Sequence, residues 1–162
     1  MSIAYAEFET ATHSKRFVSR GNVTRTVLLH CLIVSESSER REFFTSAAEA
    51  TGWEVTVCAD AHAATATANR FRHALVIVDL EPGSSSYLRA LTEDLSANAA
   101  QLLMVCGAEG NPLEEIWARQ LGVWLYLSGV DLTCDVESLC SEARYMADKL
   151  ALPVKPAYAR TA

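Results

Sequence analysis

The chain has 162 residues, of which half are hydrophobic and 21% are charged, and its formal net charge is −6. This length and composition fit one globular domain with a sizeable core. The acidic balance argues against a nucleic-acid-binding surface, which needs clustered Lys and Arg. No apolar run approaches the ~20 residues that span a bilayer.

The cysteines and the N-terminus indicate a cytoplasmic protein with reduced thiols. The five cysteines are odd in number and form no CxxC pair. Cys31, Cys58 and Cys106 lie within apolar runs, where a thiol acts as a small buried hydrophobe, and the spacing of a zinc site is absent. The N-terminus lacks the apolar segment of a signal peptide.

Regular secondary structure is expected from Val27 onward. The first half of the pattern predicts a strand over 27–34, a helix over 38–51, a strand over 53–58, a helix over 61–71 and a strand over 74–78. Gly52 is a natural stop for the first helix, and Asp60 is placed to cap the second. The strand over 74–78 is the most apolar and is followed at once by Asp79.

The second half continues the alternation. It predicts a helix from 84 to about 97, a strand over 102–106, a helix from Asn111-Pro112 to Gly122, a strand over 123–127 and a helix over 133–150. Five strands alternating with five helices predict an α/β fold with a parallel sheet and right-handed crossovers. We expect residues 26–151 to form one domain, preceded by an extension over 1–25 and followed by a tail over 152–162.

Acidic residues follow two of the predicted strands. In such sheets ligands bind beyond the carboxyl ends of the strands, so Glu36, Asp79 and Glu81 are candidates for one carboxylate cluster that holds Mg²⁺. Structural roles compete with this reading. Glu36 also suits an exposed acid near a helix N-terminus, Asp79 a turn or cap residue, and Glu81 a solvated turn residue.

Three segments together resemble the receiver domain of two-component response regulators. They are LIVSE at 32–36, LVIVDLEPG at 75–83 and GVWLYLS at 122–128, and the resemblance spans residues 27–150. It implies a flavodoxin-like, three-layer sandwich whose five-stranded parallel sheet has the order 2-1-3-4-5. It also implies that Asp79 matches the phospho-accepting aspartate of the family.

The resemblance implies a depleted acidic pocket. In the family two acids after the first strand join the acceptor to bind Mg²⁺. Here Glu36 matches one of them, but the other position is Ser35. Glu81 follows Asp79 in a loop whose proline arrives one residue early. We expect no resident cofactor, and any metal in this pocket would be Mg²⁺ held by Glu36 and Asp79.

The family's switch positions are also altered. The hydroxyl that contacts the phosphoryl group falls on Cys106 or Gly107, neither of which donates a strong hydrogen bond. The lysine position falls on Gly129, whereas Tyr126 matches the switch aromatic.

These losses predict a pseudo-receiver. An acyl phosphate brings about two negative charges beside existing carboxylates, which a metal and a cation must offset. No Lys or Arg directly follows a strand, so we expect a pocket without a compensating cation. The chain is then a stand-alone receiver-like module that acts through protein–protein interaction, without conventional aspartyl phosphorylation.

Two alternatives remain. One is a phosphorylatable regulator that uses Asp79 with an atypical metal site. The other is a small α/β enzyme or nucleotide-binding domain, but GxGxxG, Walker A and GxSxG motifs are absent. His30 lies within a strand and His73 precedes one, so neither is placed for catalysis. We expect no enzymatic activity.

The expected partner is another signalling protein, such as a kinase or an output protein, because no output segment follows residue 150. A homodimer through the last helices and the fifth strand is a further expectation. Trp117, Trp124 and Tyr145 are candidate contacts, although Trp124 alternates with core positions, which favours burial. The basic segment 15–20 suits a solvated leader or a contact to RNA, an acidic partner or a membrane. For the whole chain we expect neither nucleic acid nor membrane as a partner.

Overall fold

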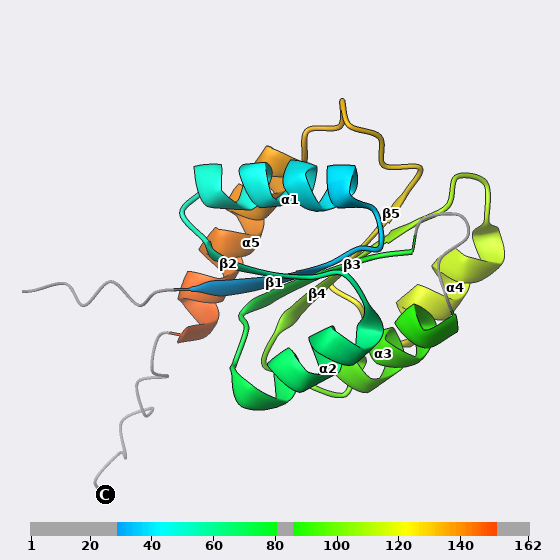
Figure 1. Ribbon diagram of the computed structural model, residues 1–162, viewed down its shortest axis with the longest axis horizontal. Helices are drawn as coiled ribbons and strands as arrows, with labels where there is room; N and C mark the ends of the chain where they lie inside the picture. Colours follow the sequence, from blue (N-terminus) through cyan, green and yellow to red (C-terminus); the bar gives the residue numbers. More distant parts are fainter. Residues whose placement is uncertain (1–28, 81–85, 152–162) are drawn as a thin grey trace, which may run out of the picture.

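The computed structural model describes residues 29–80 and 86–151, and in these residues strands and helices alternate as predicted (Figure 1). The elements are β1 (His30–Val34), α1 (Ser38–Ala50), β2 (Glu54–Cys58), α2 (Ala61–Arg70), β3 (Leu75–Asp79), α3 (Ser86–Ser96), β4 (Leu102–Gly107), α4 (Pro112–Gln120), β5 (Leu125–Ser128) and α5 (Val136–Ala151). Predictions for the extension, the tail and Glu81 concern residues outside this part.

The five strands form one parallel sheet in the order β2-β1-β3-β4-β5, which confirms the predicted fold class. In its register Val34 of β1 lies beside Val78 of β3, and Asp79 lies beside Cys106 of β4. The carboxyl ends of the three central strands therefore meet at one edge of the sheet.

The helices cover both faces of the sheet, as Figure 1 shows: α1 and α5 lie on one face, and α2, α3 and α4 on the other. Each face has its own apolar core. Phe44 of α1 and Cys140 of α5 belong to the first core, whereas Leu88 of α3 belongs to the second. Alternate residues of β3 enter opposite cores, because successive side chains of a strand point to opposite faces.

Helices α1, α2 and α4 begin at side-chain caps. The Ser37 side chain accepts a hydrogen bond from the backbone N–H of Arg40, the Asp60 side chain from that of Ala63, and the Asn111 side chain from that of Glu114. These oxygens satisfy N–H groups that have no partner within the helix. The predicted cap of α2 and the predicted start of α4 at Asn111-Pro112 are thereby confirmed. No helix in the described ranges is both long and apolar enough to cross a membrane.

Candidate functional site

Asp79 ends β3 at the carboxyl edge of the sheet, and its side chain is completely buried. Ser35 directly follows β1 and is also fully buried. Ser35 Oγ donates a hydrogen bond of 2.7 Å to Asp79 Oδ2. The position that the sequence matched to the family's second acid therefore holds a hydroxyl that binds Asp79.

A guanidinium from α1 holds both oxygens of Asp79. Arg40 Nε lies 2.7 Å from Asp79 Oδ2, and Arg40 Nη2 lies 2.7 Å from Asp79 Oδ1. This bidentate geometry is the strong form of an arginine–carboxylate pair. The third nitrogen, Nη1, donates a 2.5 Å hydrogen bond to the carbonyl oxygen of Val130, just after β5.

The prediction of a pocket without a compensating cation is therefore wrong. Arg40 supplies the positive charge from the first turn of α1 rather than from the end of a strand. Its side chain is only 12% exposed, and the Phe44 ring lies 5.5 Å below the guanidinium carbon. The cation is thus fixed between a core aromatic ring and the carboxylate.

One signal in the sequence marks Arg40 as unusual. Arg40 and Arg41 fall in the first turn of α1, where the helix dipole disfavours positive charge. Both have acceptors beyond the helix: Arg40 binds Asp79 and Val130, and Arg41 Nη1 donates to the carbonyl oxygen of Ser35 at 2.7 Å. Two basic residues in the first turn of a helix are thus a sequence signal for hydrogen-bond acceptors at the adjoining edge of the sheet.

The arrangement leaves Asp79 with little capacity for further bonds. A carboxylate has about four acceptor positions. Arg40 and Ser35 together use three of them on Asp79. Beside Asp79, the thiol of Cys106 is completely buried, and burial raises its pKa, with the charge of Asp79 as a second cause. Cys106 therefore stays a neutral thiol in the pocket wall.

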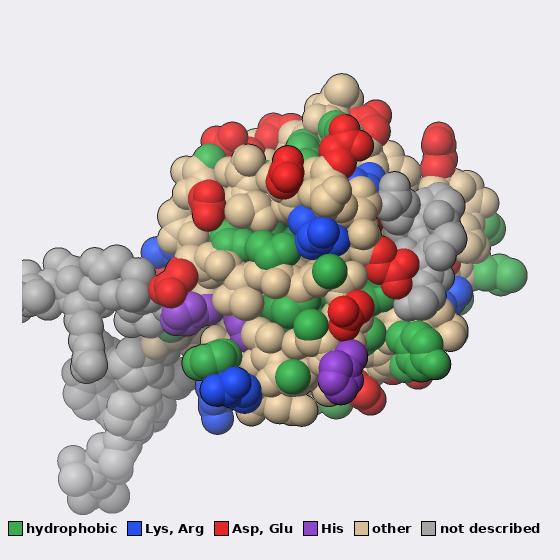
Figure 2. All heavy atoms as spheres, viewed as in Figure 1, with side chains coloured by type: hydrophobic (Ala, Val, Ile, Leu, Met, Phe, Trp, Pro, Cys, Tyr) green, Lys and Arg blue, Asp and Glu red, His purple; other side chains and the backbone are tan. Residues whose placement is uncertain are grey.

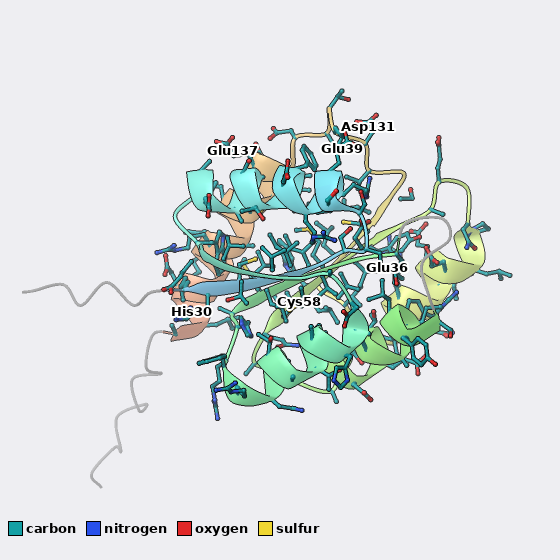
Figure 3. The ribbon with its side chains drawn as sticks, in the orientation of Figure 1. His30, Glu36, Glu39, Cys58, Asp131 and Glu137 are labelled. Carbon is teal, nitrogen blue, oxygen red and sulfur yellow. The ribbon has the colours of Figure 1, made fainter. Side chains whose placement is uncertain are left out.

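The acids that the sequence predicted to form one cluster differ in their exposure to solvent. Glu36 is exposed at the carboxyl edge of the sheet, where Figure 3 labels it, whereas Asp79 is buried. Glu81 lies outside the described residues. Within residues 29–80 and 86–151, no group of three or more His, Cys, Asp or Glu side chains is placed to hold a metal ion.

Tyr126, which the sequence matched to the family's switch aromatic, is held by a buried acid. Its hydroxyl donates a 3.1 Å hydrogen bond to Glu114 Oε1, which also accepts the backbone N–H of Ala108 at 3.1 Å. Glu114 is buried, and Arg89 Nη1 lies 3.8 Å from its other oxygen. Burial, followed by the bond to Glu114, raises the pKa of Tyr126 to about 12.

Gly107 gives Tyr126 the space it occupies. A Cβ at Gly107 would lie 2.2 Å from the Tyr126 hydroxyl and 2.2 Å from Glu114 Oε1. A threonine or serine is therefore sterically excluded at this position while Tyr126 is held in this way. Sequence reasoning named Gly107 and Tyr126 separately, but it missed Glu114, the acid that binds the tyrosine.

Gly129, which the sequence matched to the family's lysine, has a backbone conformation that favours glycine. Its φ is +64°, a conformation that L side chains rarely adopt. A Cβ there would lie 2.9 Å from the Cβ of Glu109. A lysine at this position would therefore be strained.

No model of a protein family and no curated protein matches the sequence. Solved receiver structures match the fold. A CheY-like receiver domain protein from Methanospirillum hungatei has 17% identity and a TM-score of 0.62, over 76% of this chain and 96% of its own. The receiver domain of a putative LuxO repressor protein from Vibrio parahaemolyticus has 14% identity and a TM-score of 0.63, over 76% and 95%. A receiver domain protein from Clostridium thermocellum has 19% identity and a TM-score of 0.60, over 76% and 99%.

At these identities the likeness concerns the fold. The chain has the flavodoxin-like architecture of response-regulator receiver domains, and the match spans nearly the whole length of those domains. The chemistry at the carboxyl edge of the sheet has to be judged from this chain's own residues.

Proposed function

We propose that this chain is a pseudo-receiver, a signalling module that acts through protein–protein interaction without conventional phosphorylation of Asp79. The observation that carries the proposal is the bidentate pair between Arg40 and Asp79. In this pair the guanidinium occupies the oxygens that a receiver needs for its metal and its phosphoryl group. The pair therefore holds the Asp79 side chain and the residues around it in one conformation.

The rest of the pocket supports a single fixed state. Arg40 also binds the Val130 carbonyl after β5, so α1 and the segment after β5 are joined through the same side chain. Tyr126 is bonded to Glu114, and Gly107 offers no hydroxyl to draw it elsewhere. A module of this kind presents a constant surface to its partner.

Two exposed apolar residues of α4 are candidates for that surface. Leu113 is 76% exposed and Ile116 is 52% exposed, and their spacing puts them on one face of the helix. Tyr145 of α5, a predicted contact, is 54% exposed. Trp117 and Trp124 are half-buried against the two cores and offer less area. The proposed partner is a kinase or an output protein of a signalling system.

A labelling experiment tests the proposal. The purified chain is incubated with acetyl phosphate and Mg²⁺ and its mass is measured, alongside a phosphorylation-competent receiver as positive control. We expect no phosphoryl adduct on this chain. A stable adduct that disappears in Asp79→Asn would contradict the proposal.

The same experiment addresses the alternative of a phosphorylated Asp79 with relaxed metal chemistry. One observation favours that alternative: Arg40 provides a charge that could pair with a phosphoryl group. The variant Arg40→Gln separates the two. If the guanidinium blocks the acceptor, Arg40→Gln gains labelling; if the guanidinium assists, labelling of the native chain is lost in the variant.

A further inference from the structure

A basic cavity opens at the amino end of the sheet, opposite the edge that holds Asp79. Its volume is about 800 Å³, within the usual range for small-molecule sites. The end of α2 and the residues between α2 and β3 form much of its wall, and the start of β1, the segment before β4 and the last residue of α5 complete it. Figure 3 labels His30, one wall residue, at the end of β1 far from Glu36.

The charge of this cavity is opposite to that of the chain. It is lined by Arg70, Arg72, His30 and His73 and, among the residues that the structure describes, by no Asp or Glu, although the net charge of the protein is −6. In Figure 2 blue side chains lie at the lower left, at the end of α2 that leads to β3, and purple side chains lie just above them. One wall residue faces an acid: Glu54 Oε2 lies 3.5 Å from His30 Nδ1.

The two arginines are available to a ligand. Among the described residues, neither Arg70 nor Arg72 forms an ion pair with a carboxylate. A guanidinium binds phosphate with two parallel hydrogen bonds, so two such groups on one wall favour a phosphate-bearing anion over a single carboxylate.

The remaining wall groups are polar but neutral, or aromatic. Burial, with the neighbouring His30 as a second cause, lowers the pKa of His73, so its imidazole is a neutral hydrogen-bonding group near pH 7. Asn69 and Asn98 contribute amides. The Phe71 ring is 59% exposed, and the guanidinium carbon of Arg70 lies 5.7 Å from its centre. An exposed ring beside a guanidinium is a surface on which a flat ring can stack.

We propose that this cavity binds a small organic phosphate that carries an aromatic ring, the chemical class of the nucleotides. Arg70 and Arg72 bind the phosphates, Phe71 stacks on the ring, and the two asparagines and His73 hydrogen-bond to its polar edge. The site lies at the opposite end of the sheet from Asp79 and does not depend on the function proposed above.

Calorimetric titration of the full-length chain with ATP and with pyrophosphate, both without Mg²⁺, tests the charge part of the site. We expect both probes to bind, and Arg70→Gln and Arg72→Gln each to weaken both about tenfold. Arg119→Gln, which removes an exposed arginine of α4 that pairs with Glu115, is the control for general charge and should change the Kd less than about twofold. Equal losses in Arg119→Gln would reduce the effect to general charge and overturn the proposal.

Phe71→Ala tests the ring part. We expect it to weaken ATP several-fold and to leave pyrophosphate unchanged, because only ATP carries a ring. Equal losses for both probes, or no binding of either probe to the native chain, would overturn the proposal. A single-stranded oligonucleotide that binds far more tightly than ATP would also overturn it, since the site would then serve a nucleic acid.

Discussion

The pair between Arg40 and Asp79 is the main energetic feature at the scale of single residues. The Asp79 side chain is fully buried, so removal of its cation leaves a buried charge without compensation. Arg40→Gln is therefore expected to lower the free energy of unfolding by about 3–5 kcal/mol. Urea denaturation followed by tryptophan fluorescence measures this loss.

A double-mutant cycle measures the coupling free energy between Arg40 and Asp79. Asp79→Asn alone should also destabilise the fold, because it leaves the guanidinium without its anion. The double variant Arg40→Gln, Asp79→Asn should lose less than the sum of the two single variants, since neither charge is then left alone. Strict additivity would mean that the two side chains do not stabilise each other.

Tyr126 predicts a dependence of stability on alkaline pH. Its pKa is raised from 10.0 to about 12 in the folded chain, mainly by burial and then by the bond to Glu114. Between these two values the unfolded state has lost the proton and the folded state keeps it. The contribution is thus fully present below pH ~10 and is lost as the pH rises through ~12.

The variant Tyr126→Phe isolates this contribution. Buried thiols such as Cys140, whose pKa is raised to about 11 mainly by burial, weaken the fold over an overlapping range. The comparison is therefore the difference in unfolding free energy between the native chain and Tyr126→Phe, measured from pH 9 to pH 12. We expect this difference to shrink as the pH rises; a constant difference would mean that Tyr126 titrates normally.

At this scale the sequence predicts the positions but not the contacts. Asp79 and Ser35 follow from their places at the ends of strands, and Tyr126 follows from the resemblance to receiver domains. Arg40 is 39 positions before Asp79 and lies on a helix, so its contact depends on how α1 is set on the sheet. Glu114 was missed for a similar reason: it reads as a helix-dipole acid in the first turn of α4, yet it faces Tyr126.

At the scale of elements, β4, α4 and β5 meet around Gly107. Gly107→Thr introduces a hydroxyl but places a side chain in the space of Tyr126 and Glu114. Overpacking of this kind costs about 1–3 kcal/mol. We expect a lower melting temperature for Gly107→Thr, measured by circular dichroism.

Removal of the obstructing ring should relieve the clash. In the background Tyr126→Ala, the further change Gly107→Thr is expected to cost much less than it does in the native chain. Gly107 has an ordinary negative φ, unlike Gly110 and Gly129, so the contact alone decides the effect. An equal cost in both backgrounds would point to the backbone instead.

Element boundaries show where sequence patterns lose precision. β3 was predicted almost to the residue, because all of its side chains are buried and it ends at a charged group. β5 starts at Leu125, two residues after the predicted start, and its side chains are only partly buried. An apolar run at the edge of a sheet continues beyond its hydrogen-bonded part, and composition alone does not mark that limit.

At the scale of the whole molecule, the architecture is independent of the chemistry at its edge. The parallel sheet is stabilised by two apolar cores, one on each face, and neither core contains Asp79 or Arg40. This explains how the order of strands and layers follows from apolar runs and helix caps, and why receiver structures match at 14–19% identity. The same independence means that the fold by itself does not say whether Asp79 is phosphorylated.

The last prediction concerns the outer face of α4. Leu113 and Ile116 are exposed and lie apart from both cores, so the double change Leu113→Asp, Ile116→Asp should alter the stability by no more than about 0.5 kcal/mol per residue. If this face binds the signalling partner, buried carboxylates in the interface should strongly reduce the amount of partner that the chain captures from native lysate.

The control is Phe71→Asp, which changes an exposed aromatic residue at the opposite end of the sheet and should leave capture unchanged. Sedimentation of both variants tests whether the partner is a second copy of this chain. Undiminished capture and an unchanged sedimentation coefficient in the α4 variant would exclude this face as the interface.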